Sequence, residues 1–83
     1  MAAKTFHLTV ARVSENVFDG EALSVLLPGK EGVFEVLANH EAFVSELRIG
    51  QARITAADGT HYHVEMPHGG VAEVSGNQAT VLL

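Results

Sequence analysis

The 83-residue chain contains no cysteine and no tryptophan, and it has only two prolines and one tyrosine. Without cysteine no disulfide can hold the fold, so stability must come from packed strands or helices, or from a partner. A chain of this length predicts one domain, here residues 1–83. Such a domain buries only about 60% of the surface that its unfolded chain exposes, so its hydrophobic core is thin.

Basic residues are also scarce, because five Lys and Arg stand against ten Asp and Glu, giving a formal net charge of −5. They are scattered along the chain at Lys4, Arg12, Lys30, Arg48 and Arg53. Nucleic-acid binding needs a concentrated basic patch, and anionic lipid likewise attracts clustered Lys and Arg. The composition therefore argues against a nucleic-acid partner and against direct insertion into lipid.

Long apolar runs are missing as well. A transmembrane helix needs about 20 consecutive apolar residues, whereas runs such as Val25-Leu26-Leu27 are short. The amino terminus, Met1 to Lys4, leads directly into an alternating pattern, with no apolar stretch typical of a signal peptide. We therefore expect a soluble intracellular protein.

The apolar residues that are present alternate with polar ones. Phe6, Leu8 and Val10 fall on one face of their segment, as in a half-buried strand. In the next apolar segment, Leu23, Val25 and Leu27 are expected to share a face. The same alternation recurs in residues 34–36, 52–56, 62–66, 72–74 and 80–83. This period of two predicts an all-β chain.

Turn signals separate these segments at short intervals. They are Asp19-Gly20, Pro28-Gly29, Gly32, Gly50, Asp58-Gly59, Gly69-Gly70 and Gly76-Asn77. Asp58-Gly59 predicts a hairpin with a type I′ turn, in which both central residues have positive φ. Many short strands with regular turns indicate a β-sandwich or barrel. Residues 39–48 are compatible with either a helical turn capped by Asn39 or a strand through Phe43 and Val44.

Five histidines suggest a metal site, and His61 and His63 lie two apart on an expected strand, about 6.5 Å from one another. His68 is a possible third ligand. However, no cysteine is present and the nearby carboxylates show no diagnostic zinc spacing. A polar strand face is the simpler interpretation, and a binding module with a metal or small ligand at these histidines is the alternative.

Catalytic motifs are not found. There is no Gly-x-Ser-x-Gly elbow and no cysteine nucleophile. His40 and Glu41 are adjacent, so on a strand they point to opposite faces. Pro28-Gly29-Lys30-Glu31-Gly32 lacks the Ser or Thr of a phosphate loop, and we interpret it as a tight exposed corner. The sequence predicts neither an enzyme nor a cofactor.

Several short motifs follow one another along nearly the whole chain. They are Phe6-His7-Leu8, Val17-Phe18-Asp19-Gly20, Pro28-Gly29-Lys30-Glu31-Gly32, Val36-Leu37-Ala38-Asn39-His40, Leu47-Arg48-Ile49-Gly50 with Arg53-Ile54, Gly69-Gly70-Val71-Ala72-Glu73-Val74, and Thr80-Val81-Leu82. Each motif alone is weak, but their order and spacing are specific. Together they resemble the amino-terminal β-sandwich domain of the epsilon subunit of F-type ATP synthases, which is called delta in mitochondria.

The resemblance implies a flattened sandwich of two antiparallel sheets without chemistry of its own. It implies a rotor subunit of the central stalk that binds the gamma subunit and rests on the c-ring, coupling proton or sodium transport to ATP synthesis. By position, Arg12 and His40 match the gamma contact, and Lys30, Glu31 and Val33 match the segment facing the c-ring. The expected location is the cytoplasmic face of the inner or plasma membrane, peripherally through the complex.

Two departures from the family pattern add expectations. The family domain is normally followed by a regulatory two-helix hairpin, whereas this sequence stops at Leu83, so that hairpin is not expected. Pro67-His68 adds one residue before Gly69, which predicts a bulge in the strand. Finally, a docking role predicts that part of an exposed sheet face or an edge strand is more apolar than a monomer needs.

Overall fold

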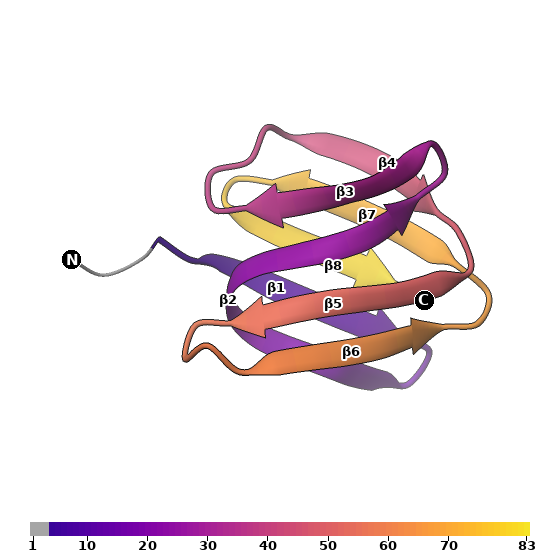
Figure 1. Ribbon diagram of the computed structural model, residues 1–83, viewed down its shortest axis with the longest axis horizontal. Helices are drawn as coiled ribbons and strands as arrows, with labels where there is room; N and C mark the ends of the chain where they lie inside the picture. Colours follow the sequence, from indigo (N-terminus) through magenta and orange to yellow (C-terminus); the bar gives the residue numbers. More distant parts are fainter. Residues whose placement is uncertain (1–3) are drawn as a thin grey trace.

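The computed structural model describes residues 4–83, and Met1–Ala3, the start of the predicted domain, lie outside this part (Figure 1). Eight strands follow in chain order: β1 (Phe6–Arg12), β2 (Glu15–Gly29), β3 (Gly32–Leu37), β4 (Phe43–Leu47), β5 (Gly50–Ala56), β6 (His61–Met66), β7 (Gly70–Ser75) and β8 (Gln78–Leu82). All regular elements in the described residues are strands, which confirms the all-β prediction. Accordingly, nothing in residues 4–83 forms a helix of the length and apolar character needed to cross a membrane.

The long strand β2 connects two layers that face each other (Figure 1). Its first half pairs with β1, and its second half pairs with β3 on one side and β5 on the other. The layer of β3, the second half of β2, β5 and β6 is called the β5 sheet below. The layer of the first half of β2, β1, β8, β7 and β4 is called the β8 sheet. This arrangement confirms the predicted sandwich.

One strand pair departs from the antiparallel pattern. β1 and β8 run parallel, with Leu8 opposite Ala79 and Val10 opposite Val81, while the other pairings are antiparallel. Parallel neighbours need a long connection between them, and here that connection is most of the chain. Local alternation cannot predict such a pairing, because β1 and β8 lie at opposite ends of the sequence.

The core lies between the two sheets and is formed by the alternating apolar side chains. Phe6, Leu8 and Val10 are almost completely buried, as predicted. In β2 the pattern shifts, because the pairing with β5 has an irregularity between Ala22 and Ser24. The buried residues of this segment are therefore Ala22, Val25 and Leu27, and Leu23 is only half-buried, contrary to the sequence prediction.

The turns are partly those expected from the sequence. A hairpin joins β5 and β6, but Gly59 alone has positive φ there, so the predicted type I′ turn at Asp58-Gly59 is wrong. Instead, the Asp58 carboxylate accepts a hydrogen bond from the Thr60 backbone N–H (2.9 Å) and shapes a four-residue loop. The two-residue turn with positive φ at both positions is Gly76-Asn77 (58° and 60°), between β7 and β8.

Three other local expectations are settled. Asp19-Gly20 is not a turn but lies inside β2, because both residues pair with β1. Residues 43–47 form a strand rather than a helical turn. Pro67-His68 does not bulge a strand, since β6 ends at Met66 and the extra residue is absorbed in the turn that leads from β6 in one sheet to β7 in the other.

Candidate docking site

The residues matched to the c-ring contact come together at one corner of the sandwich. Lys30 and Glu31 form the turn between β2 and β3, and Val33 follows with 73% of its surface exposed. The Lys30 ammonium lies 2.9 Å from a carboxylate oxygen of Glu46 on β4, and the Lys30 backbone N–H donates to the Glu46 carbonyl (3.2 Å). These contacts attach the corner to β4 across an open groove of about 680 Å³.

The two residues matched to the gamma contact lie at opposite ends of the sandwich. Arg12 is the last residue of β1. His40 lies in the loop from β3 to β4, beside the turn that precedes β8 and the start of β1. The seven-residue length of β1 therefore separates them, or about 20 Å at 3.3 Å per residue. A single partner reaches both only if it lies along the strands.

A short apolar row crosses the outer face of the β8 sheet at the end where Arg12 lies. Val71 on β7 pairs with Leu82 on β8, and Leu82 pairs with Ala11 on β1. Val71 and Leu82 are 40% and 55% exposed, and Val44 on the neighbouring β4 is 70% exposed. Val71 and Leu82 are thus two large apolar side chains side by side, with the smaller Ala11 next to Leu82. Val44 lies two positions along β4 from Glu46, the residue opposite Val71. Adjacent exposed apolar side chains of this kind mark a candidate contact surface.

Asn77 holds the His40 loop in place. Its side-chain oxygen accepts a hydrogen bond from the Asn39 backbone N–H (2.7 Å), and its side-chain nitrogen donates to the Thr5 carbonyl (2.9 Å). The His40 ring itself packs on Phe43, with ring centroids 5.0 Å apart. Sequence reasoning identified Gly76-Asn77 only as a turn and missed that one side chain ties three segments together.

A charged cluster occupies the outer face of the β8 sheet near the start of β1. The His7 ring lies between two carboxylates of β2, with Nε2 2.7 Å from Asp19 and Nδ1 3.1 Å from Glu21. Thr9 and Thr5 donate hydrogen bonds to the same two carboxylates. The hydrogen bond with Asp19 is the main cause of a raised pKa of His7, and that with Glu21 is the second.

The histidines of the alternative metal or ligand site do not assemble. His61 and His63 lie on the exposed face of β6, and His68 lies beyond the other end of that strand. His61 Nδ1 is 3.2 Å from the Thr55 hydroxyl. Within residues 4–83, no group of three or more His, Asp or Glu side chains is arranged to hold a metal ion. The geometry of the described residues therefore does not support a metal site at these histidines.

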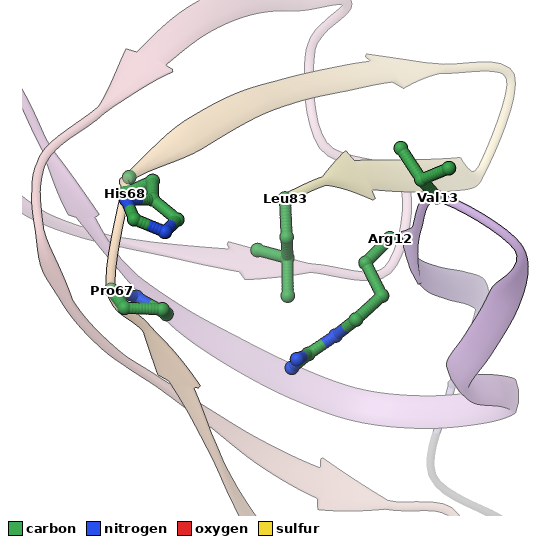
Figure 2. Close-up of a pocket in the computed structure, with 6 residues that line it drawn as sticks. Arg12, Val13, Pro67, His68 and Leu83 are labelled. Carbon is green, nitrogen blue, oxygen red and sulfur yellow. The ribbon is translucent and has the colours of Figure 1, made fainter.

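A small pocket lies at the end of the sandwich where β1 and β8 finish (Figure 2). This open pocket of about 230 Å³ lies between the turn after β1, the turn after β6 and Leu83. Its lining residues are Arg12, Val13, Pro67, His68, Gly69 and Leu83. Sequence reasoning had no signal for it, because the lining comes from three distant segments.

The fold and these surfaces define a class of protein. The chain is a small β-sandwich whose exposed apolar row and charged corner are suited to docking against other proteins, as in a non-catalytic subunit of a larger assembly. Residues 5–83 match the family described as "ATP synthase, Delta/Epsilon chain, beta-sandwich domain". The chain therefore belongs to the delta/epsilon family of ATP synthase subunits, which confirms the resemblance found in the sequence.

Individual relatives agree with this assignment. The ATP synthase epsilon chain of Polaromonas naphthalenivorans is 40% identical over 94% of this chain and 56% of its own length. That of Chlorobium limicola is 33% identical over 95% of this chain and 89% of its own length. The chain thus spans little more than half of the Polaromonas relative but most of the Chlorobium one.

Solved structures share the fold. A chain in the Euglena gracilis mitochondrial ATP synthase, in a structure of OSCP, F1 and the c-ring, superposes with a TM-score of 0.87 at 23% identity, over 99% of this chain and 52% of the other. A chain in the central stalk and c-ring of the Tetrahymena thermophila enzyme gives 0.73 at 14% identity, over 99% and 65%. At these identities the likeness establishes the sandwich architecture.

Proposed function

We propose that the chain is a coupling subunit of the ATP synthase rotor, which links the gamma subunit to the c-ring so that ion transport drives ATP synthesis. It has no catalytic role and acts at the cytoplasmic face of the membrane, peripherally through the complex. Membership of the delta/epsilon family supports this proposal. So do the solved relatives, which come from a structure containing F1 and the c-ring and from one of a central stalk with its c-ring.

The apolar row on the β8 sheet is the observation that carries the gamma contact. Arg12 and His40 lie at the two ends of this sheet, and the row of Ala11, Leu82 and Val71 crosses the outer face beside Arg12. A partner lying along the strands covers the row and reaches both ends at once. Protein–protein interfaces usually combine a buried apolar part with polar residues at the rim, and here Arg12 stands at the rim of the apolar row.

The corner at Lys30 and Glu31 is proposed to meet the c-ring. It lies at the same end of the sandwich as Arg12, because the Arg48 backbone N–H donates to the Pro28 carbonyl (2.8 Å) and Gly69, which lines the Arg12 pocket, lies against Leu47. The opposite charges of Lys30 and Glu31 fit a polar surface, and Val33 adds an exposed apolar contact. In this proposal the end of the domain that carries Lys30 and Glu31 contacts the c-ring, and the outer face of the β8 sheet contacts gamma.

Binding of the purified gamma subunit from the same source tests the proposal. Leu82→Glu and Val71→Glu place a charge in the apolar row and should weaken binding by about tenfold or more, because a desolvated charge without a partner is costly. Leu37→Glu is the matched control, since Leu37 is 49% exposed on β3 of the other sheet. It should bind like the unsubstituted chain.

Two results would contradict the proposal. One is absence of binding by the unsubstituted chain at micromolar gamma. The other is equal loss of binding in Leu82→Glu and Leu37→Glu, because that would mean the β8 sheet has no special role. Circular dichroism of each variant confirms that the substitutions leave the fold intact.

A further inference from the structure

Two backbone segments around the pocket at the end of the sandwich pack against neighbouring strands. The Leu83 backbone N–H donates to the Ala11 carbonyl (2.8 Å), which anchors the end of the chain against β1. Gly69 has a φ of +71°, and a Cβ at this position would collide with the Leu47 carbonyl oxygen. The backbone of the turn from β6 to β7 therefore packs closely against β4 on this side of the pocket.

The lining combines an apolar surface with one permanent cation and the His68 imidazole. Val13, Pro67 and Leu83 provide aliphatic walls, and Arg12 provides a guanidinium. Figure 2 shows the Arg12 side chain extending from the end of β1 back toward Leu83 and Pro67. Mostly apolar sites with a few polar groups that fix orientation are typical of small-ligand pockets, and they occur at the mouths of β-barrels.

The guanidinium has hydrogen-bond donors to spare. Among residues 4–83 its ion-pair neighbour is Glu15, and the approach of Nε to that carboxylate is 3.8 Å, too long for a hydrogen bond. An arginine carries five N–H donors in a planar fork that matches a carboxylate. Glu15 therefore neutralises part of the Arg12 charge without taking up the N–H donors of its guanidinium.

The geometry points to a carboxylate-binding pocket: we propose that it takes a carboxylate carried on a short aliphatic body, with the carboxylate on Arg12 and the hydrocarbon against Val13, Pro67 and Leu83. An enclosed apolar cavity of about 150 Å³ accommodates benzene, so 230 Å³ has room for about five or six carbons. A short-chain fatty acid has this chemistry. So does an acidic side chain flanked by aliphatic residues on a partner protein.

Titration of the isotope-labelled chain with hexanoate, followed by amide chemical shifts, tests this binding without any partner. The shifts should saturate with a Kd on the order of 1–10 mM, as expected for a ligand of this size in an open pocket. They should be confined to the turns after β1 and β6 and to the end of β8. Hexylammonium and hexanol are the ligand controls, and neither should give saturable shifts there.

Three variants sharpen the test. Arg12→Gln should weaken hexanoate binding roughly tenfold, because it removes the charge-assisted hydrogen bonds. Arg53→Gln makes the same change on an exposed position of β5 and should leave binding unchanged. Glu15→Gln removes the competing carboxylate and should tighten binding. The amide spectrum of each variant reports whether it is folded.

The proposal is overturned if hexanoate gives no saturable shifts, if hexanol gives the same shifts, or if Arg12→Gln binds as well as Arg53→Gln. These outcomes do not bear on gamma binding, so failure of the pocket and failure of the proposed function are separate results. Repeating the titration with gamma bound identifies the source of the carboxylate. Loss of hexanoate binding assigns the pocket to a side chain of gamma, and unchanged binding assigns it to a free acid.

Discussion

His7 shows how one residue can make the stability of this domain depend on pH. Its two ring nitrogens contact Asp19 and Glu21 at 2.7 and 3.1 Å. Both nitrogens can donate a hydrogen bond only when the imidazole is protonated. On its other side, His7 pairs with Gln78 of β8, which is not ionisable. The ionisable groups that face His7 from the neighbouring strands are therefore Asp19 and Glu21 of β2. Protonation therefore strengthens the attachment of β1 to β2.

The first prediction compares the chain with His7→Gln between pH 5.5 and 9 at low salt. Because the pKa of His7 is raised in the folded state, its stabilising effect is complete below the unfolded pKa of about 6.5. It disappears as the pH rises through the higher folded value. The Tm difference between the two proteins should thus be largest near pH 6 and shrink toward pH 9.

A second histidine variant is the control for this experiment. His63→Gln removes an exposed histidine of β6 that has no ion-pair partner among residues 4–83. Its Tm difference from the unsubstituted chain is the reference with which the pH dependence of His7→Gln is compared. A constant difference for His7→Gln would mean that the contacts with Asp19 and Glu21 do not titrate as the geometry requires.

The sequence only partly predicted how the candidate site residues are arranged. Lys30, Glu31 and Val33 are neighbours in the chain, so their gathering at one corner was expected. The separation of Arg12 from His40 was not predicted, because it depends on the lengths and the pairing of strands that are distant in the sequence. The partners Glu46 and Asn77 were missed for the same reason, since each contacts residues more than ten positions away.

At the scale of the elements, period-two alternation located the strands well but failed at β2. Asp19-Gly20 is a strong turn signal in isolation, yet both residues lie in mid-strand, opposite Thr9 and Leu8 of β1. Tertiary pairing overrides local propensity here, as it often does in sheets. The parallel contact of β1 with β8 was equally invisible, because no local pattern encodes a pairing across the whole chain.

The second prediction concerns hydrogen exchange of the strands. β1 pairs on both sides, with β2 and β8, whereas β6 pairs with β5 alone in the described residues. Consecutive amides of β1, from Leu8 to Val10, should be protected by a factor of about 10³ or more. In β6 every second amide has no partner strand and should exchange much faster. Exchange measured by NMR distinguishes the two patterns.

Uniform protection along β6 would contradict this assignment of the edge strand. It would mean that another strand, from a second copy of the chain for instance, covers the edge in solution. Repeating the exchange at lower protein concentration separates the two situations, since protection by a second copy is lost on dilution.

At the scale of the molecule, the two sheets share one core and one long strand, so neither is expected to unfold alone. The buried cluster draws residues from all eight strands, including Phe6 and Leu8 of β1. A further contact joins the sheets at their margin, where the Phe18 ring of β2 lies edge-on to Tyr62 of β6, with centroids 5.4 Å apart. A rigid unit of this kind transmits displacement well, because packed interiors have low compressibility.

The third prediction is that urea unfolds the domain in one transition. Tyr62 is the only tyrosine and the chain lacks tryptophan, so tyrosine fluorescence reports the Phe18 contact between the sheets, and far-UV circular dichroism reports the strands. The two midpoints should coincide. Leu8→Ala should lower both midpoints together, because it leaves a cavity in the core. It should reduce the free energy of unfolding by about 2–5 kcal/mol, out of a total of roughly 4–12 kcal/mol expected for a domain of this length.

Val33→Ala, at an exposed position, is the control and should shift neither midpoint appreciably. An earlier fluorescence midpoint would show that β6 detaches first, and a domain that opens in this way is not a rigid link.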